Sequence, residues 1–286
     1  MQVLKEMTRA ERQELWRKHW GWKSPEEFGL TSSENSEEQL SFPRPSRAER
    51  NVPRSSKGHC TAYSFTGSGS GYVIQAESHL ELKVQTVLEA TPDVADMREQ
   101  VKFRYGFSDA PEQMHVFDLV VTLDTGQKIA CAIKPEFRVH KPKRNHRTFY
   151  SEMQEVAWWV HELGFADDVK IFTERDIDPI DFHNAKLSNA VKRLPDTHDQ
   201  DALSVLRILP VGSGQTVSEL TQKLGRSMNG VRAFYRLLFQ GHATLLKREK
   251  INAESVIVNA HPRAQGQFPE IFPRLGSAAL NALNEI

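Results

Sequence analysis

Three residues between positions 77 and 135 have the side chains that a metal-dependent phosphodiesterase requires. Glu81 lies in a segment with helical periodicity, Asp118 lies within an apolar strand-like run, and Lys134 is near the end of the next such run. A carboxylate within an apolar strand is costly unless it is paired or binds a metal ion. Mg²⁺ binds carboxylate oxygens and activates water, and a nearby lysine orients or polarises that water. The spacing therefore predicts Mg²⁺-dependent hydrolysis of a phosphodiester, with Mn²⁺ able to replace Mg²⁺.

The elements that must position these residues follow from hydrophobic periodicity. Leu80, Val84 and Leu88 share one helical face, which predicts a helix over about 77–90 with Glu81 beside its buried stripe. Further apolar runs predict an edge strand, two strands joined by a DTG turn, a helix, a strand and a second helix, at 98–105, 116–123, 127–135, 149–163, 169–173 and 176–194. This order predicts an α/β core with a mixed sheet.

The C-terminal part predicts three short helices and a β-hairpin, the layout of a winged helix. Thr216 and Glu219 stand in the positions of a capping box. The helix at 227–239 has the place of a recognition helix, so its basic side chains are expected to face DNA. Winged helices also serve as protein-docking modules, and the sequence favours neither role over the other.

The chain is thus expected to have four segments. They are an N-terminal helix with a basic linker, a catalytic domain, a winged-helix domain and a tail suited to binding a partner, at 1–71, 72–196, 197–260 and 261–286.

Basic residues that are candidates for binding DNA cluster in three of these places. The loop at 136–148 follows directly after Lys134, so a phosphate-facing role is expected there, with a flexible exposed loop as the alternative. The linker either lies along a phosphate backbone or stays solvated. The candidates are Arg138, Lys141, Lys143, Arg144 and Arg147 in the loop, Arg50 and Arg54 in the linker, and Arg232 and Arg236 in the third helix of the winged helix.

Bulk composition gives a weaker signal. Lys+Arg and Asp+Glu both total 37, so net charge indicates neither a nucleic-acid nor a membrane partner. Cys60 and Cys131 are far apart and lack metal-ligand spacing, which suits a reducing cytosol. No apolar run approaches the ~18 residues that a membrane span needs. We expect a soluble cytoplasmic protein.

The motifs ESHLELKVQTVLEATPDVADMREQ, FDLVV and IACAIKP, in this order, resemble the TnsA family, the endonuclease subunits of heteromeric cut-and-paste transposons. The resemblance covers roughly residues 45 to 260 and implies a restriction-endonuclease-like core of the PD-(D/E)xK type followed by a winged helix. It implies that Glu81, Asp118 and Lys134 are catalytic, and that Asp118 and the main-chain carbonyl of Ile133 bind the metal ion.

The resemblance also implies a cellular setting. The protein would cut the 5′ ends of a transposon in the bacterial cytoplasm, while a transposase of the DDE type cuts the 3′ ends. An ATP-dependent regulator would couple the pair to a target site. Such a subunit is expected to be silent without its partners.

Ala132 departs from the family pattern. The family has Glu, Asp or Gln two residues before the lysine as a metal ligand, and alanine has no ligating side-chain atom. The position has three explanations: an inactivating substitution, which we favour, a naturally inactive relative, or replacement by another acid, with Glu136 and Glu155 as candidates. We therefore expect weakened Mg²⁺ binding and little cleavage by this sequence.

Two other functions remain open from the sequence. One is a stand-alone restriction or defence nuclease of the same fold, which would cut without partners. The other is a non-catalytic DNA-binding or assembly scaffold that keeps the nuclease core as a framework.

Overall fold

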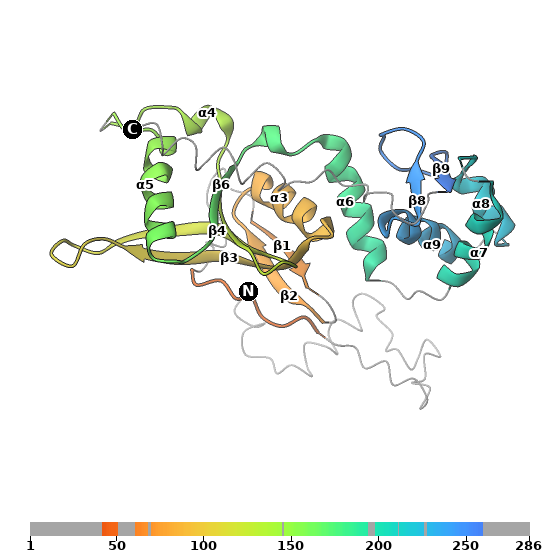
Figure 1. Ribbon diagram of the computed structural model, residues 1–286, viewed down its shortest axis with the longest axis horizontal. Helices are drawn as coiled ribbons and strands as arrows, with labels where there is room; N and C mark the ends of the chain where they lie inside the picture. The colour runs from red at the N-terminus through yellow and green to blue at the C-terminus, as the bar shows by residue number, and fades with distance from the viewer. Residues whose placement is uncertain are drawn as a thin grey trace, which may run out of the picture. The chain divides into compact units, whose positions relative to one another are not determined.

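A computed structural model describes residues 42–50, 61–67, 70–144, 146–193, 198–210, 212–225 and 228–259 (Figure 1). The side chains of residues 228 and 229 are not among the described parts. The chain divides into two compact units, residues 1–42 and 43–286, and the elements below belong to the second. The expected N-terminal helix, Arg54, the domain boundary near residue 196 and the tail at 261–286 lie outside the described residues.

A four-stranded mixed sheet forms the centre of the region at 72–196, as the sequence predicts. Its strand order is β3-β4-β5-β6. The first two pairings are antiparallel and the third is parallel, and β3 is an edge strand. The strands are β3 (Val94–Tyr105), β4 (Gln113–Leu123), β5 (Lys128–Ile133) and β6 (Asp168–Phe172).

Helices cover both faces of this sheet (Figure 1). Helix α3 (His79–Ala90) buries Val84 and Leu88 in a cluster with one face of the sheet, as its periodicity predicts. Helix α5 (Phe149–Glu162) buries its own stripe in a second cluster on the other face. Helix α6 (Pro179–Lys192) packs against α3.

The β3–β4 ladder is irregular beside Asp118. Glu99 pairs with Leu119 and Val101 pairs with Phe117, so Gln100 and Asp118 lie opposite each other without a regular pair. Gln100 has a φ of 52°, in the left-handed region that non-glycine residues rarely adopt. Leu119 packs in the α3 cluster and Phe117 in the α5 cluster, although residues two apart share one face of a regular strand. The two faces of β4 therefore exchange at Asp118.

The region expected to be a linker is partly structured. Strands β1 (Ala62–Thr66) and β2 (Tyr72–Ala76) form an antiparallel hairpin. Residues 46–50 lie along the outer edge of β3, and Arg44 makes a single parallel bridge to Tyr72 of β2. Residues 43–50 and β1 fall within the linker predicted up to residue 71, and ion pairs and backbone pairing hold them in place despite their few apolar residues.

The C-terminal region contains the predicted helices and hairpin. A further strand completes a small sheet of order β7-β9-β8. Thr216 and Glu219 form the predicted capping box with both of its hydrogen bonds. The elements are α7 (Asp199–Ile208), β7 (Gly214–Thr216), α8 (Val217–Lys223), α9 (Met228–Phe239), β8 (Ala243–Leu245) and β9 (Val256–Asn259).

Some short elements were not predicted from the sequence. They are the strands β1, β2 and β7, the one-turn helix α4 (Glu136–Val139) and the 3₁₀ turn η2 (Glu174–Asp176). Among the described residues, no helix has both the length and the apolar character to cross a membrane.

Candidate functional site

The structure places Glu81, Asp118 and Lys134 on three adjoining elements. Glu81 is in the first turn of α3 and only 7% exposed. Asp118 is at the irregular position of β4, and Lys134 directly follows the last residue of β5. These are the elements that the sequence predicts for them.

Electrostatic coupling links the three side chains. The pKa of Asp118 is raised to about 7, chiefly by burial and also by the negative charges of Glu81 and Glu77. The main-chain N–H of Ile133, which donates to the Asp118 carboxylate at 2.6 Å, and the positive charge of Lys134 lower this pKa in part. A partly buried carboxylate flanked by another acid and a lysine is typical of catalytic and cation-binding sites.

Glu81 also has a structural task. Its carboxylate accepts the main-chain N–H of Glu77 at 2.8 Å and the hydroxyl of Ser78 at 2.8 Å, and Ser78 caps the helix by accepting from the N–H of Glu81. Burial raises the pKa of Glu81, whereas these two hydrogen bonds lower it. The acid is therefore held in one orientation by the start of its own helix.

Lys134 lies where the sheet meets the start of α5. Its N–H donates to the carbonyl of Phe172 at 2.9 Å, and its ammonium nitrogen lies 4.9 Å from the ring centroid of Phe149. The same ammonium contributes to lowering the pKa of His115 to about 4, after the larger effect of burial. The lysine is thus fixed on the α5 side of Asp118.

Ala132 lies in an apolar environment. It is 2% exposed and belongs to the α5 cluster together with Ala130, Phe117 and Met153. The part of the chain that the structure describes contains no group of three or more His, Cys, Asp or Glu side chains suited to hold a metal ion. The oxygen donors of Glu81, Asp118 and the Ile133 carbonyl are of the kind that a hard cation such as Mg²⁺ prefers, but position 132 supplies no third side-chain ligand.

The two suggested replacement acids are engaged elsewhere. Glu136 pairs with Arg175 at 3.2 Å, and Glu155 pairs with Arg147 at 2.5 Å. Neither is among the groups that shift the pKa of Asp118. Glu77 is among them; it is the first residue of the ESHLEL motif, but nothing in the motif pattern distinguishes it as a site residue.

The loop candidates for DNA binding are mostly exposed. Arg138 is exposed and its guanidinium lies 5.4 Å from the ring of the exposed Phe137. Lys141 and Arg144 are also exposed. Lys143 and Arg147 form ion pairs with acids of α5, Glu152 and Glu155.

The candidates outside the loop lie in other surroundings. Arg50 bonds to Glu77 and Gln100 beside the acids. Arg236 is 6% exposed, and its guanidinium contacts the Asp199 carboxylate at 2.6–3.0 Å and the Val191 carbonyl at 3.2 Å. The prediction that Arg236 faces DNA is therefore wrong, because its donors are used inside the fold. Arg232 is half-buried on the same helix.

Arg236 is buried because α9 packs among neighbouring helices. Residues 233–238 are all buried, and the helix packs against α6, α7 and α8. The connection between β8 and β9 also contacts α6. Arg248 pairs with Asp181 at 2.9 Å, and the Asn184 side chain bonds to the Glu249 carbonyl and the Ile251 N–H, each at 3.0 Å. Much of the surface expected to read DNA thus packs within the chain.

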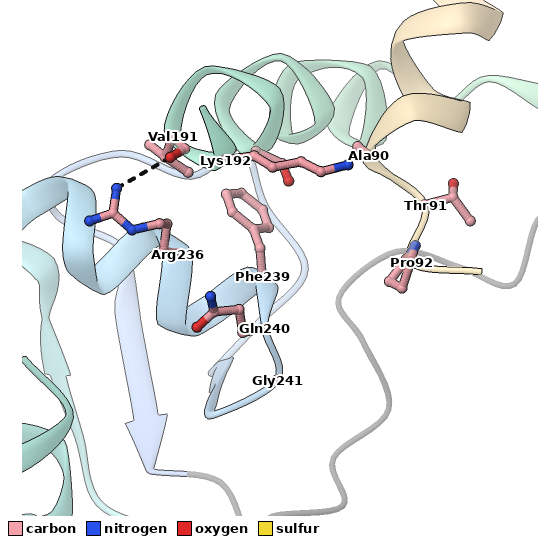
Figure 2. Close-up of a pocket in the computed structure, with 10 residues that line it drawn as sticks. Ala90, Thr91, Pro92, Val191, Lys192, Arg236, Phe239, Gln240 and Gly241 are labelled. Atoms are coloured by element: carbon pink, nitrogen blue, oxygen red, sulfur yellow. Dashed lines mark hydrogen bonds between the residues drawn. The ribbon is translucent and has the colours of Figure 1, made fainter. Parts of the chain in front are cut away.

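A cavity of about 510 Å³ lies where the C-terminal ends of α3, α6 and α9 meet (Figure 2). Figure 2 shows the guanidinium of Arg236 bonded to the Val191 carbonyl on one side and Phe239 directed toward α6. Pro92 and Lys192 also line it. None of the three candidate catalytic residues lines this cavity, so it is separate from the site above.

No protein-family model matches the chain, and a comparison with curated proteins gives no match either.

Proposed function

We propose that the chain is the endonuclease subunit of a TnsA-like transposition system, which cuts the 5′ ends of a transposon by metal-dependent hydrolysis. One observation carries the proposal: the partly buried Asp118 on β4 is coupled electrostatically to Glu81 on α3 and to Lys134 at the end of β5. Restriction-endonuclease-like nucleases use a strand acid, a helix acid and a strand lysine in this order.

Each residue has a defined chemical task in this proposal. Glu81 and Asp118 hold a divalent cation with the Ile133 carbonyl, and Lys134 orients the attacking water. The cation, when bound, activates that water and offsets the charge on the scissile phosphate. A neighbouring metal ion favours the ionised form of Asp118, which burial alone opposes.

The proposed substrate is transposon-end DNA, and the exposed basic residues of the 136–148 loop would contact its phosphates. The helix and strand order of the C-terminal region supports a winged helix. Because α9 and the β8–β9 connection pack on the rest of the chain, this region is proposed to dock protein rather than read bases. Its proposed partners are a DDE transposase and an ATP-dependent regulator.

The apolar surroundings of Ala132 favour a second candidate function, a non-catalytic scaffold that retains the core. Restoring a carboxylate at position 132 distinguishes the nuclease from the scaffold. With the transposase and end DNA of its own element and Mg²⁺, Ala132→Glu is expected to cut the 5′ ends, and Ala132→Glu with Lys134→Ala is expected not to. No gain of cutting would favour the scaffold. Cutting at defined sequences without partners would instead indicate a stand-alone nuclease.

A further inference from the structure

Residues 43–50, called the strap here, pass from β2, which Arg44 bridges at Tyr72, to the outer edge of β3, which residues 46–50 contact. The Ser46 hydroxyl donates to the Glu99 carboxylate at 2.5 Å, and Arg47 pairs with Asp96 at 2.5 Å. The Glu49 N–H donates to the Gln100 carbonyl at 3.2 Å. The strap therefore ends, at Arg50, beside the irregular position of the sheet.

Arg50 connects two elements at that point. Its guanidinium donates to the side-chain oxygen of Gln100 at 2.8 Å and 2.5 Å, and to the carboxylate of Glu77 at 2.5 Å. Gln100 is fully buried, has the left-handed φ of 52°, and lies opposite Asp118 in the ladder. Its amide nitrogen has no hydrogen-bond partner among the described residues, so Arg50 holds this side chain through its oxygen.

Glu77 leads from Arg50 to the helix acid. Its main-chain N–H donates to the Glu81 carboxylate at 2.8 Å, and it forms the turn between β2 and α3. The contacts thus run from the strand position opposite Asp118, through Arg50, to the turn that orients Glu81.

We propose that Arg50 is a positioning residue, which sets the placement of Glu81 relative to Asp118 by fixing the β2–α3 turn to β3. The inference rests on the proposed function, because those two acids are its metal ligands. Arg50 was expected to bind DNA phosphate, but its donors to Gln100 and Glu77 point into this network. A partly exposed ion pair adds little stability. The Arg50–Glu77 pair is therefore expected to hold the β2–α3 turn in place rather than to stabilise the fold.

Arg47 offers a matched control on the same strap. It makes a comparable set of bonds, to both oxygens of Asp96 and to the Met97 carbonyl, and none of these bonds reaches Glu77 or Gln100. Arg50→Ala and Arg47→Ala therefore both remove a strap cation from the edge of β3. They differ in whether the turn before Glu81 loses its anchor.

The first measurement uses the metal-free protein. The NMR signal of the Glu77 amide reports its bond to the Glu81 carboxylate. Arg50→Ala is expected to shift this signal and to speed its hydrogen exchange at least tenfold, whereas Arg47→Ala leaves it unchanged. Equal behaviour of the two variants would overturn the inference, because strap loosening alone would then explain the effect.

The second measurement is Mn²⁺ affinity of the full chain. Loss of a residue that orients metal ligands typically weakens binding about 10–100-fold. Arg50→Ala is expected to lose about tenfold and Arg47→Ala less than twofold, with Asp118→Ala as the reference that abolishes binding. If only Asp118→Ala weakens binding, the inference fails and the proposed site survives. If Asp118→Ala leaves binding unchanged, or the chain binds no Mn²⁺, both fail.

Discussion

The main-chain N–H of Ile133 donates a 2.6 Å hydrogen bond to the carboxylate of Asp118. The regular β4–β5 pairing reaches Leu119 and Cys131, so this bond continues the contact between the strands at the point where the ladder stops. It directs a partly buried acid to the end of β5, one residue before Lys134. This relationship brings an acid and a lysine from neighbouring strands into one site.

Restoring an acid at position 132 is expected to destabilise the metal-free protein. Ala132 is 2% exposed among apolar side chains, and an uncompensated buried charge costs roughly 3–5 kcal/mol. If the new carboxylate reaches the cation, Mg²⁺ at ten times its Kd returns about 1.4 kcal/mol. Urea unfolding of Ala132→Glu with and without Mg²⁺ measures both effects.

Ala130→Glu is the control for that experiment. Ala130 is fully buried in the same cluster, two residues earlier on β5. The Ala130→Glu variant should lose a similar amount of stability, and Mg²⁺ should restore none of it. Equal recovery in the two variants would mean that Mg²⁺ acts elsewhere on the protein.

Arg236→Ala is expected to act through stability rather than through DNA contacts. The change leaves the largely buried Asp199 without its bidentate partner, which costs about 3–5 kcal/mol. Replacing both residues, as Arg236→Ala with Asp199→Asn, should cost less than the sum of the two single changes. Urea denaturation of the four proteins gives the coupling. Additive costs would show that the pair does not interact as described.

The core elements could be predicted from the sequence because their signals are local. The stripe of Val84 and Leu88 and the β-branched run of β4 each show their own period within a few residues. The capping box of Thr216 and Glu219 is likewise confirmed by its two hydrogen bonds. Metal-ligand roles for Glu81 and Asp118 stay predictions, although the structure brings the two acids within electrostatic reach of each other.

The errors concern partners that are distant in sequence. Arg236 looks like a surface cation on a helix, and only its pairing with Asp199, 37 residues earlier, shows that it is buried. Arg50 bonds to Gln100, 50 residues later, so the strap resembles a solvated linker in sequence. Charge pairing of this kind has no period, and its register is fixed only when the sheet has formed.

His115 predicts a defined loss of stability in acid. Its folded-state pKa is lowered from 6.5 to about 4 by burial and by Lys134 and Lys143, against the opposing charge of Glu152. A lowered pKa means that the stabilising contribution is complete above pH 6.5 and is lost as the pH falls toward 4. The loss by pH 4.5 is about 2 kcal/mol.

His115→Gln removes this titration and leaves the others. The difference in urea midpoint between pH 7 and pH 4.5 should therefore be smaller in the variant than in the parent protein. The same pH dependence in both would place His115 in a solvated environment and contradict its burial beside Lys134.

The central claim is that Glu81 and Asp118 hold one divalent cation together. Mn²⁺ binding to the full chain, followed by electron paramagnetic resonance, tests it most directly. Glu81→Gln and Asp118→Asn should each weaken binding at least tenfold. The control is Asp168→Asn, which changes another partly buried strand acid, paired with Ile129 at the opposite end of β5. Mn²⁺ affinity that is unchanged in Asp118→Asn, or reduced equally in Asp168→Asn, would contradict the account.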